Sequence, residues 1–600
     1  MLKVPRPEHP RPDFERSNWI NLNGEWQFEI DIGKSGFERG WATGRDFGQK
    51  IIVPFPPESV LSGLGVTDFM ESVWYRRFFG LPESWLDKRV LLHFGAVDYE
   101  TKVYVNGRQV VQHRGGYAPF TCDISDAVRV GDNELVVWAR DECRSKLQAS
   151  GKQSHRLESY GCFYTRVTGI WQTVWLESVP HIYVQSFRLT TDPNHGKVFV
   201  RACVGGRGKR FSLSMMASEG REAIAEIDGT FCRSPAELVL ALPSSRVWSP
   251  QDPYLYRLRL QLSSGDNLVD TVDSYFGLRD IHVVDNRLLL NNKTRFLRLV
   301  LDQGYYREGV YTAPSDDALK HDVEISKAMG FDGARLHQKI FEPRFLYWAD
   351  NLGYVVVEEF PDWGADISQS SAREALLDEW IEVVQRDFNH PCVIVWTPFN
   401  EKTFAIGDQC ADFIRRIVRL TRLSDPTRPI IDSSGRTHVE TDIYDVHDYE
   451  QNGDKFRSHY ADLEGPTAKA WDQTTSFDRR ALPAIFQRNA PYKGQPFMVS
   501  EYGGTWWQPE EPHAKSWGYG ERPKSAEELT ARYKVLTECL LLNPAISAFC
   551  YTQLYDIEQE ANGLHTYDRR PKIEARIIRD INKQEAAIEK MHRNKEKNRR

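Results

Sequence analysis

The chain has 600 residues, a formal net charge of −7, and 27% charged and 41% hydrophobic residues. One hydrophobic core does not organise this length, which predicts roughly three to four domains. The modest negative charge without a basic stripe argues against a nucleic-acid partner. No stretch approaches the roughly 18 apolar residues of a membrane span, so no membrane partner is expected either.

Cysteine usage and the first residues bear on the expected compartment. The nine cysteines are an odd number and lack the close pairs of a zinc site, which predicts free thiols in a reducing compartment. Residues 1–14 lack the apolar segment of a secretory signal, so a cytoplasmic location is expected, although a trimmed signal would leave no trace. The charged stretch 583–600 is expected to be a solvated helix end.

The first segment, residues 1–180, is rich in expected strands. Its short runs alternate apolar and polar residues and are separated by Gly, Pro, Asn and Asp. Asn106 and Gly107 lie between two β-branched runs, a strong signal for a hairpin turn. A β-sandwich of the jelly-roll type is the simplest fold with this pattern.

The second segment, residues 181–280, is also rich in expected strands, but it is shorter. It contains short strand-like runs at the spacing of a sandwich, and its length of roughly a hundred residues is typical of an immunoglobulin-like domain. The stretch 248–256 has two prolines, which favour an edge or a turn over a central strand.

In the third segment, residues 281–600, apolar strands alternate with amphipathic helices. One clear helix is expected over 315–330, with Ser315 or Asp316 as its N-cap. The helix between the sixth and seventh strands, in 450–494, is the hardest to place. Eight strands with crossover helices predict a (β/α)8 TIM barrel. The expected strands are 296–304, 331–338, 353–363, 393–401, 429–435, 443–449, 496–504 and 546–556.

The expected barrel strands end in polar residues almost without exception. In such barrels the catalytic groups lie at the carboxyl ends of the strands, so this pattern predicts an active site there. The residues are Asp302, His337, Glu358, Glu359, Asp362, Glu401, Asp432, His447, Tyr449, Glu501, Gln553 and Asp556.

Two of these residues form the pair on which the functional prediction depends. Glu401 ends the run VIVWTPFNE and Glu501 follows the run PFMVS, at the expected fourth and seventh strands. Paired carboxylates about 5–5.5 Å apart cleave glycosidic bonds with retention, whereas a separation of about 6.5–9.5 Å leaves room for a water and gives inversion. One carboxyl group must hold its proton near neutral pH and the other must stay ionised. The pair predicts a retaining glycosidase.

These motifs, in this order, resemble glycoside hydrolase family 2, which includes β-galactosidases, β-glucuronidases and β-mannosidases. The likeness runs from NGEWQF at residue 23 to YDRRPK at residue 572. It implies that Glu401 is the acid/base and that Glu501, in SEYGG, is the nucleophile. It also implies that Asn400 binds the sugar 2-hydroxyl group, a contact that strengthens in the transition state, and that residues 1–180 form a sugar-binding-like domain.

Further residues are expected to bind the substrate. Arg335 and His337 resemble a region of the family in which a histidine lines the sugar site. Tyr502 could orient the nucleophile beside it, although a core tyrosine would look the same. Trp506 and Trp507, on a Gly-rich loop, suit a platform for a sugar ring. The expected set, besides Asn400, is Asp302, Arg335, His337, Glu359, His447, Tyr449, Tyr502, Trp506 and Trp507.

Two departures from the family bear on the sugar. Where the β-glucuronidases have an Asn-x-Lys pair for the substrate carboxylate, this chain has Glu560 and Asn562, and a carboxylate there argues against glucuronides. The stretch after the first strand, LDQGYYREG at 301–309, lacks the Asn-Arg-His-Glu pattern of well-known β-galactosidases. A β-galactosidase is nevertheless the expected activity, with β-glucuronidase, β-mannosidase or a furanosidase (for arabinofuranosides or galactofuranosides) as alternatives.

Outside catalysis, the alternative is a carbohydrate-binding scaffold whose barrel has lost activity, although both glutamates are present. No metal or cofactor is expected, because no residue cluster has metal-ligand spacing and the mechanism needs none. The expected partner is a small-molecule or oligosaccharide glycoside. The resemblance implies that the chain could also form a homo-oligomer. The stretches 450–494 and 505–525 are expected to narrow the pocket to one sugar.

Overall fold

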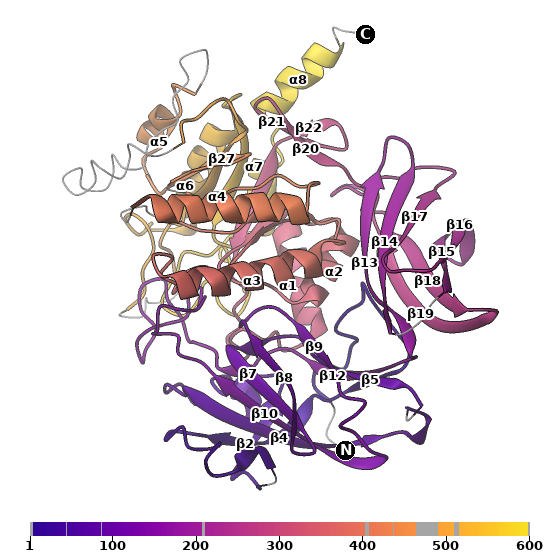
Figure 1. The fold of residues 1–600 in the computed structure, drawn as a ribbon. Helices are drawn as coiled ribbons and strands as arrows, with labels where there is room; N and C mark the ends of the chain where they lie inside the picture. Colours follow the sequence, from indigo (N-terminus) through magenta and orange to yellow (C-terminus); the bar gives the residue numbers. More distant parts are fainter. Residues whose placement is uncertain are drawn as a thin grey trace.

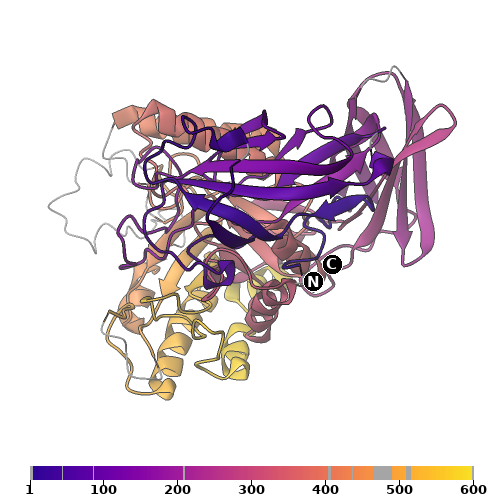
Figure 2. The ribbon, with the colours of Figure 1, turned by 90° about the horizontal axis from the view of Figure 1, so that it is seen from below.

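The computed structural model describes residues 4–597 except 44, 86, 207–209, 403–406, 436, 464–489 and 509–514. Two β-sandwiches flank a parallel barrel. In Figure 1 the first sandwich lies below the barrel and the second lies at its right. The view from below in Figure 2 shows the strands of the first sandwich crossing the barrel helices.

The first sandwich has the two antiparallel sheets of a jelly roll. Inward-facing side chains of both sheets, such as Trp26 and Leu176, form one buried core. The larger sheet has the order β3 (Gln49–Val53), β2 (Gly24–Ile30), β4 (Ser72–Leu81), β10 (Gly131–Arg140), β7 (Glu100–Val105) and β8 (Arg108–Arg114). The smaller sheet has the order β1 (Trp19–Asn21), β12 (Val174–Val179), β5 (Arg89–Phe94) and β9 (Phe120–Asp123), and β6 (Val97–Asp98) pairs with β11 (Gly169–Ile170).

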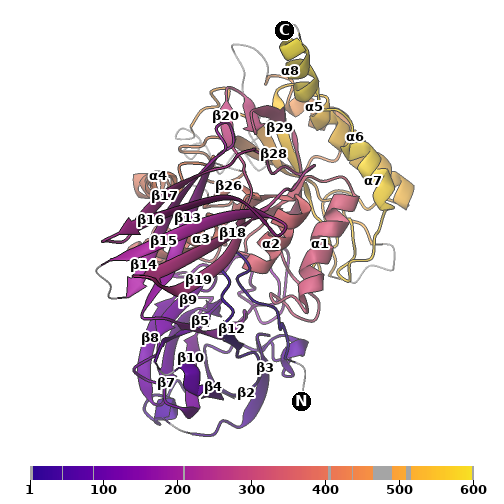
Figure 3. The ribbon, with the colours of Figure 1, turned by 90° about the vertical axis from the view of Figure 1, so that its right-hand side faces the viewer.

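The second sandwich is immunoglobulin-like, and in Figure 3 its strands lie in front of the barrel helices. Regular alternation, such as the buried and exposed residues of β18, places one face of each sheet in the shared core. One sheet contains β13 (Ile182–Asp192), β14 (Lys197–Gly206) and β17 (Ala236–Ala241), and the other contains β16 (Glu222–Phe231), β15 (Phe211–Glu219), β18 (Tyr256–Ser264) and β19 (Asn267–Phe276).

Seven parallel strands form the barrel sheet among the described residues, preceded by a small antiparallel sheet of β20 (Ile281–Val284), β21 (Arg287–Leu290) and β22 (Lys293–Arg295). Every residue of the seven strands is buried, as expected for a parallel sheet covered by helices. Their order is β26 (Val393–Thr397), β25 (Val355–Glu359), β24 (Gly333–Leu336), β23 (Leu297–Asp302), β29 (Ile546–Thr552), β28 (Phe497–Gly503) and β27 (Tyr444–Asp448).

The expected fifth strand, 429–435, is not a regular strand. It makes isolated parallel bridges to the β26 side of the barrel, Trp396 with Ile430 and Asn400 with Ser434. The backbone then turns, because Asp432 accepts hydrogen bonds from the backbone N–H group of Glu440 and from the His438 ring. The prediction of a strand was therefore wrong here, although the segment still occupies the gap between β26 and β27.

The helices begin and end close to their sequence signals. Ser315 caps α1 by accepting a hydrogen bond from the N–H group of Ala318, and Gly330 follows its end with a φ of 81°. Part of 450–494 and part of 505–525 lie outside the described residues. The helices are α1 (Asp316–Ala328), α2 (Pro343–Leu352), α3 (Ser370–Asp387), α4 (Gly407–Ser424), α5 (Gly453–His459), α6 (Ala526–Leu541), α7 (Ala575–Asn582) and α8 (Ala587–Lys597).

All nine cysteines are free thiols, as the sequence predicts. In the described part of the chain, no helix has the length and apolar character that a membrane crossing requires.

Candidate active site

Glu401 and Glu501 meet at the carboxyl ends of the barrel strands. Glu501 lies in β28, and Glu401 follows β26 with a φ of 50°, a conformation that side-chain-bearing residues seldom adopt and that is enriched at functional sites. A carboxylate oxygen of Glu401 and one of Glu501 lie within 4.8 Å of each other. The two carboxyl groups therefore face the same small volume.

His447, on β27, lies between the two carboxyl groups. Its Nδ1 is 2.9 Å from Glu401 Oε1, and its Nε2 is 3.4 Å from Glu501 Oε1. The ring is fully buried, and Gly435 packs against it so closely that a Cβ there would lie 2.3 Å from the ring. This packing holds the imidazole between the two glutamates.

Glu501 is surrounded by donors. Arg335 Nη1 donates to its Oε1 at 2.7 Å, and the Tyr449 hydroxyl donates to its Oε2 at 2.5 Å. Burial raises the pKa of Glu501, but its electrostatic interactions with His447 and Arg335 outweigh burial and lower it to about 2. The Glu501 side chain is therefore an ionised carboxylate throughout the neutral range.

Arg335 connects Glu501 to two other predicted site residues. Its guanidinium is fully buried; Nε donates to Glu359 Oε2 at 2.7 Å, and Nη2 donates to Asn400 Oδ1 at 2.7 Å. Because Arg335 takes the amide oxygen, the amide nitrogen of Asn400 can donate to a ligand. One arginine thus orients both the Glu501 carboxylate and the Asn400 amide.

His337 is also buried beside Glu501, with Nδ1 3.9 Å from its Oε1 and 2.9 Å from Glu359 Oε1. Burial, together with the charges of Lys152 and Arg335, lowers the pKa of His337 well below its ordinary value. The ring is therefore neutral and can serve as a hydrogen-bond partner rather than as a cation.

Tyr449 and Tyr519 form an aromatic wall beside Glu501. Their rings stack with centroids 3.5 Å apart and planes 7° apart. This stacking, together with a contact of 3.3 Å between the Tyr449 hydroxyl and Thr552 Oγ1, holds the hydroxyl on Glu501. Tyr519 was missed by the sequence analysis because its loop carries no strand or motif signal.

Four predicted residues lie away from the carboxylate pair. Tyr502 points to the opposite side of β28, where its hydroxyl contacts Thr537 of α6 at 2.8 Å. Asp302 accepts hydrogen bonds from the Gly304 N–H group and the Tyr555 hydroxyl. Trp507 packs in the barrel core, and the Trp506 N–H group donates to the backbone oxygen of Tyr519 at 3.2 Å. The contacts of Tyr502 and Asp302 are those of supporting residues, and the sugar-binding roles of Trp506 and Trp507 stay predictions.

The first sandwich lends residues to the barrel mouth, which the sequence did not indicate. Tyr164 donates a hydrogen bond to the buried Glu560, and Lys152 lies 5.4 Å above the Trp363 ring. Trp363 in turn donates to the backbone oxygen of Asn400 at 3.2 Å. No local pattern marks Lys152 or Tyr164, because only the packing of two domains brings them to the site.

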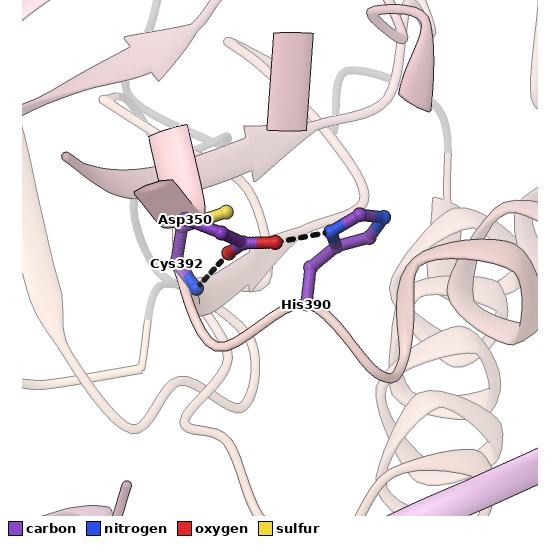
Figure 4. A group of neighbouring side chains, drawn as sticks. All are labelled: Asp350, His390 and Cys392. Atoms are coloured by element: carbon purple, nitrogen blue, oxygen red, sulfur yellow. Dashed lines mark hydrogen bonds and ion pairs between the residues drawn. The ribbon is translucent and has the colours of Figure 1, made fainter. Parts of the chain in front are cut away.

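Two groups in the described chain bring three possible metal-ligand atoms together. One is Glu401, His447 and Glu501; the other is Asp350, His390 and Cys392, shown in Figure 4. In the second group both Asp350 oxygens are used, by His390 Nδ1 at 2.6 Å and by the Cys392 N–H group at 2.8 Å. Burial lowers the pKa of His390, but Asp350 raises it overall, so an ion pair with a protonated ring fits this group better than a metal.

Replacing Tyr449 with Phe tests its contact with Glu501. A hydrogen bond to a charged group contributes roughly 1.5–3 kcal/mol, so kcat/KM is expected to fall about 10- to 100-fold. Loss of a donor destabilises the carboxylate and raises the pKa of Glu501, so the acid limb of the kcat/KM profile is expected to move to higher pH. Tyr502→Phe is the matched control and is expected to leave both quantities unchanged. An unshifted acid limb in Tyr449→Phe would contradict this role.

Comparisons with known proteins find a matching family model for each of the three structural parts of the chain. Three family models match: "Glycosyl hydrolases family 2, sugar binding domain" over residues 61–180, "Glycosyl hydrolases family 2" over 182–279, and "Glycosyl hydrolases family 2, TIM barrel domain" over 281–510. The β-glucuronidase of Mus musculus is 25% identical over 452 residues, which are 68% of this chain and 67% of that protein. The β-glucuronidase of Canis lupus familiaris is 27% identical over 479 residues, 70% of this chain and 69% of that protein.

Solved structures share the fold. The β-glucuronidase from Ruminococcus gnavus in complex with D-glucuronic acid has a TM-score of 0.76 and 19% identity, over 96% of this chain and 100% of that chain. An uncultured Clostridium sp. β-glucuronidase has a TM-score of 0.76 and 21% identity, over 94% of this chain and 98% of that chain. With family models matching all three parts of the chain, the protein belongs to glycoside hydrolase family 2 and is a glycoside hydrolase.

Proposed function

We propose that this chain is a retaining exo-β-glycosidase in which Glu501 is the nucleophile and Glu401 is the acid/base. The observation that carries the proposal is the approach of the two carboxylates to within 4.8 Å. This close approach suits direct attack by one carboxylate, whereas an inverting enzyme needs a wider separation that admits a water. Glu501, with its pKa lowered to about 2, has the ionised form that attack requires.

The chemistry proceeds in two steps. In the first, an oxygen of Glu501 forms a bond to the anomeric carbon while the bond from that carbon to the leaving oxygen breaks, and Glu401 donates a proton to the leaving oxygen. In the second, Glu401 takes a proton from water as the water oxygen attacks the anomeric carbon and releases Glu501. Both steps pass through an oxocarbenium-ion-like transition state, and the negative charge of Glu501 stabilises its positive charge.

Neighbouring groups support these roles. Arg335 and Tyr449 fix the two oxygens of Glu501, so little reorganisation is needed for attack. Asn400 has its amide oxygen engaged by Arg335, which leaves its nitrogen to donate to the sugar 2-hydroxyl group. His447, in contact with Glu401, can hold that carboxyl group in position during both proton transfers.

The names of the relatives bear on the sugar. The expected β-galactosidase activity gains no support from the relatives described above, which are named β-glucuronidases. On the names of the relatives alone, a β-glucuronide ranks ahead of a β-galactoside as the candidate substrate. At 25% and 27% identity, a few pocket residues can change the sugar that is accepted.

A panel of p-nitrophenyl glycosides tests the proposal. It includes the β-glucuronide, β-galactoside, β-mannoside, α-arabinofuranoside and β-galactofuranoside, and proton NMR follows the anomer formed first from the best substrate. The proposal expects the first product to keep the configuration of the substrate. A first product of inverted configuration would overturn it.

A further inference from the structure

We infer that Lys152 and Glu560 form the part of the pocket that binds sugar hydroxyl groups, and that this pair selects a neutral terminal sugar over a uronic acid. The inference rests on the proposed function, because it assigns the sugar that lies against Glu401 and Glu501. It adds a contribution from the first sandwich to a site otherwise built by the barrel.

A loop of the first sandwich is fixed against the barrel mouth beside Lys152. The Ser150 N–H group donates to Trp363 O at 2.8 Å, and the Gly151 N–H group donates to Pro361 O at 3.1 Å. Gly151 has a φ of 52°, and a Cβ there would lie 2.2 Å from the backbone oxygen of Gln338. Only glycine fits this contact, so the loop reaches the barrel at one defined point and directs Lys152 to the site.

Lys152 is a buried cation without a hydrogen-bond acceptor among the described residues. The residue is 8% exposed, and its Nζ lies above the Trp363 ring without a hydrogen bond or ion pair to any residue that the structure describes. Burial lowers the pKa of Lys152, but Cys162, Glu560 and Glu501 more than offset it, so the ammonium group stays charged. A buried charge is costly unless acceptors satisfy it, so its three donors favour oxygens of a bound ligand.

Glu560 is held rigidly but keeps acceptor capacity. It is 2% exposed; Tyr164 donates to its Oε2, and Asn562 Nδ2 donates to its Oε1 at 2.9 Å. Gln303 Nε2 donates to the Tyr164 hydroxyl at 2.9 Å, so residues of both domains fix this carboxylate. Each carboxylate oxygen can accept a second hydrogen bond, and a sugar hydroxyl group is a suitable donor.

The charges near the catalytic pair favour a neutral sugar. The Tyr164 N–H group donates to the Lys152 backbone oxygen at 2.8 Å, and the Tyr164 hydroxyl donates to Glu560, so one tyrosine joins the two residues. Lys152 Nζ also lies above the ring of Trp363, which donates to the backbone oxygen of Asn400 beside Glu401. Glu359 pairs with Arg335 and Asp362 pairs with Lys402, so with Glu401 protonated as the acid the remaining charges are those of Glu501, Glu560 and Lys152. Burial raises the pKa of Glu560, but both of its oxygens accept hydrogen bonds, which favours the ionised form. This excess of one negative charge complements the cationic transition state. A uronate would add a further negative charge to a buried site that already holds Glu560.

Hydroxyl groups suit both residues, because one hydroxyl group can donate to Glu560 and accept from Lys152. A uronate carboxylate could accept from Lys152 but could not donate to Glu560. The pair therefore fits the hydroxyl groups of a neutral pyranose or furanose.

The kinetics of Lys152→Met and Glu560→Gln test whether these two residues select a neutral sugar. The wild type is expected to hydrolyse one neutral p-nitrophenyl glycoside with kcat/KM at least about 100-fold above that for the glucuronide, and each variant is expected to lose about 10- to 100-fold with that neutral substrate. Lys152→Arg should recover part of the loss. Lys146→Met, an exposed lysine of the same loop, is the matched control and should retain wild-type kcat/KM.

Monodeoxy analogues of the best substrate separate a binding role from a structural one. Removing the hydroxyl group that the pair binds should lower kcat/KM of the wild type by a factor at least about 10-fold larger than for Glu560→Gln, since the variant has already lost the contact. If the wild type and Glu560→Gln lose kcat/KM equally with the deoxy analogue at every sugar position, the inference is overturned. A wild type that prefers the glucuronide, with that preference lost in Lys152→Met, would also overturn it, because Lys152 would then bind a carboxylate.

Binding without turnover keeps the two proposals distinguishable. Calorimetry with Glu501→Gln and with Glu501→Gln/Lys152→Met, against neutral free monosaccharides and D-glucuronic acid, reports on the pair alone. Tighter binding of a neutral sugar that weakens with the second substitution supports the inference, and tighter binding of glucuronic acid overturns it. Full turnover by Glu501→Gln would instead overturn the proposed nucleophile.

Discussion

Glu501→Gln is expected to lower kcat by at least ~10⁴-fold, equivalent to about 5.5 kcal/mol of transition-state stabilisation. Glutamine keeps the size of the side chain but lacks the carboxylate that attacks the anomeric carbon. Arg335 and Tyr449 hold both oxygens of Glu501, so no other described carboxylate is presented in the same way. The measurement is kcat on the best p-nitrophenyl glycoside, with wild-type and variant protein purified in parallel.

The effect must be separated from misfolding. The variant is expected to keep the wild-type thermal unfolding midpoint within a few degrees and to bind the product sugar. A small nucleophile such as azide should restore turnover in Glu501→Gly and give a glycosyl azide of inverted configuration, because azide attacks from the face that Glu501 occupies. Wild-type kcat in Glu501→Gln would remove this residue from the reaction.

Glu401→Gln is expected to have the second largest effect, and its size should depend on the leaving group. General acid catalysis contributes typically ~10²–10⁴-fold, so kcat/KM with an unactivated alkyl glycoside should fall by about this factor. A dinitrophenyl leaving group departs without a proton, so kcat/KM for that substrate should fall by less than about 10-fold. Glu501→Gln should lose activity with both substrates.

The two leaving groups thus separate the acid from the nucleophile. Azide should accelerate Glu401→Gln with the dinitrophenyl substrate and give a glycosyl azide of retained configuration, since the covalent intermediate forms but its hydrolysis lacks a base. Equal losses with both leaving groups in Glu401→Gln would contradict the acid/base assignment.

Strand patterns predicted the centre of the site because their signals are local. Glu401 and Glu501 each follow an apolar run, and parallel strands bring such ends to one rim. The same alternation of side chains that points Glu501 inward points Tyr502 outward to Thr537, so the strand pattern itself contained the signal against Tyr502.

Other features depend on contacts between distant segments. Residues 429–435 have an apolar start typical of a strand, but the hydrogen bonds of Asp432 to residues after the segment turn the backbone. Lys152 and Tyr164 come from a loop without periodicity, and Tyr519 from another. Domain packing places Lys152 and Tyr164, and backbone hydrogen bonds with Gly504 and Trp506 place Tyr519. No spacing within the sequence encodes these contacts.

The most direct test of the central claim is to trap the covalent intermediate. The 2-deoxy-2-fluoro derivative of the best substrate, with a dinitrophenyl leaving group, slows both steps but the second more, so the sugar should stay attached to the protein. Peptide mass spectrometry is expected to find the added sugar mass on Glu501. The sugar on Glu401, or an enzyme that turns over with inversion and carries no label, would contradict a retaining mechanism through Glu501.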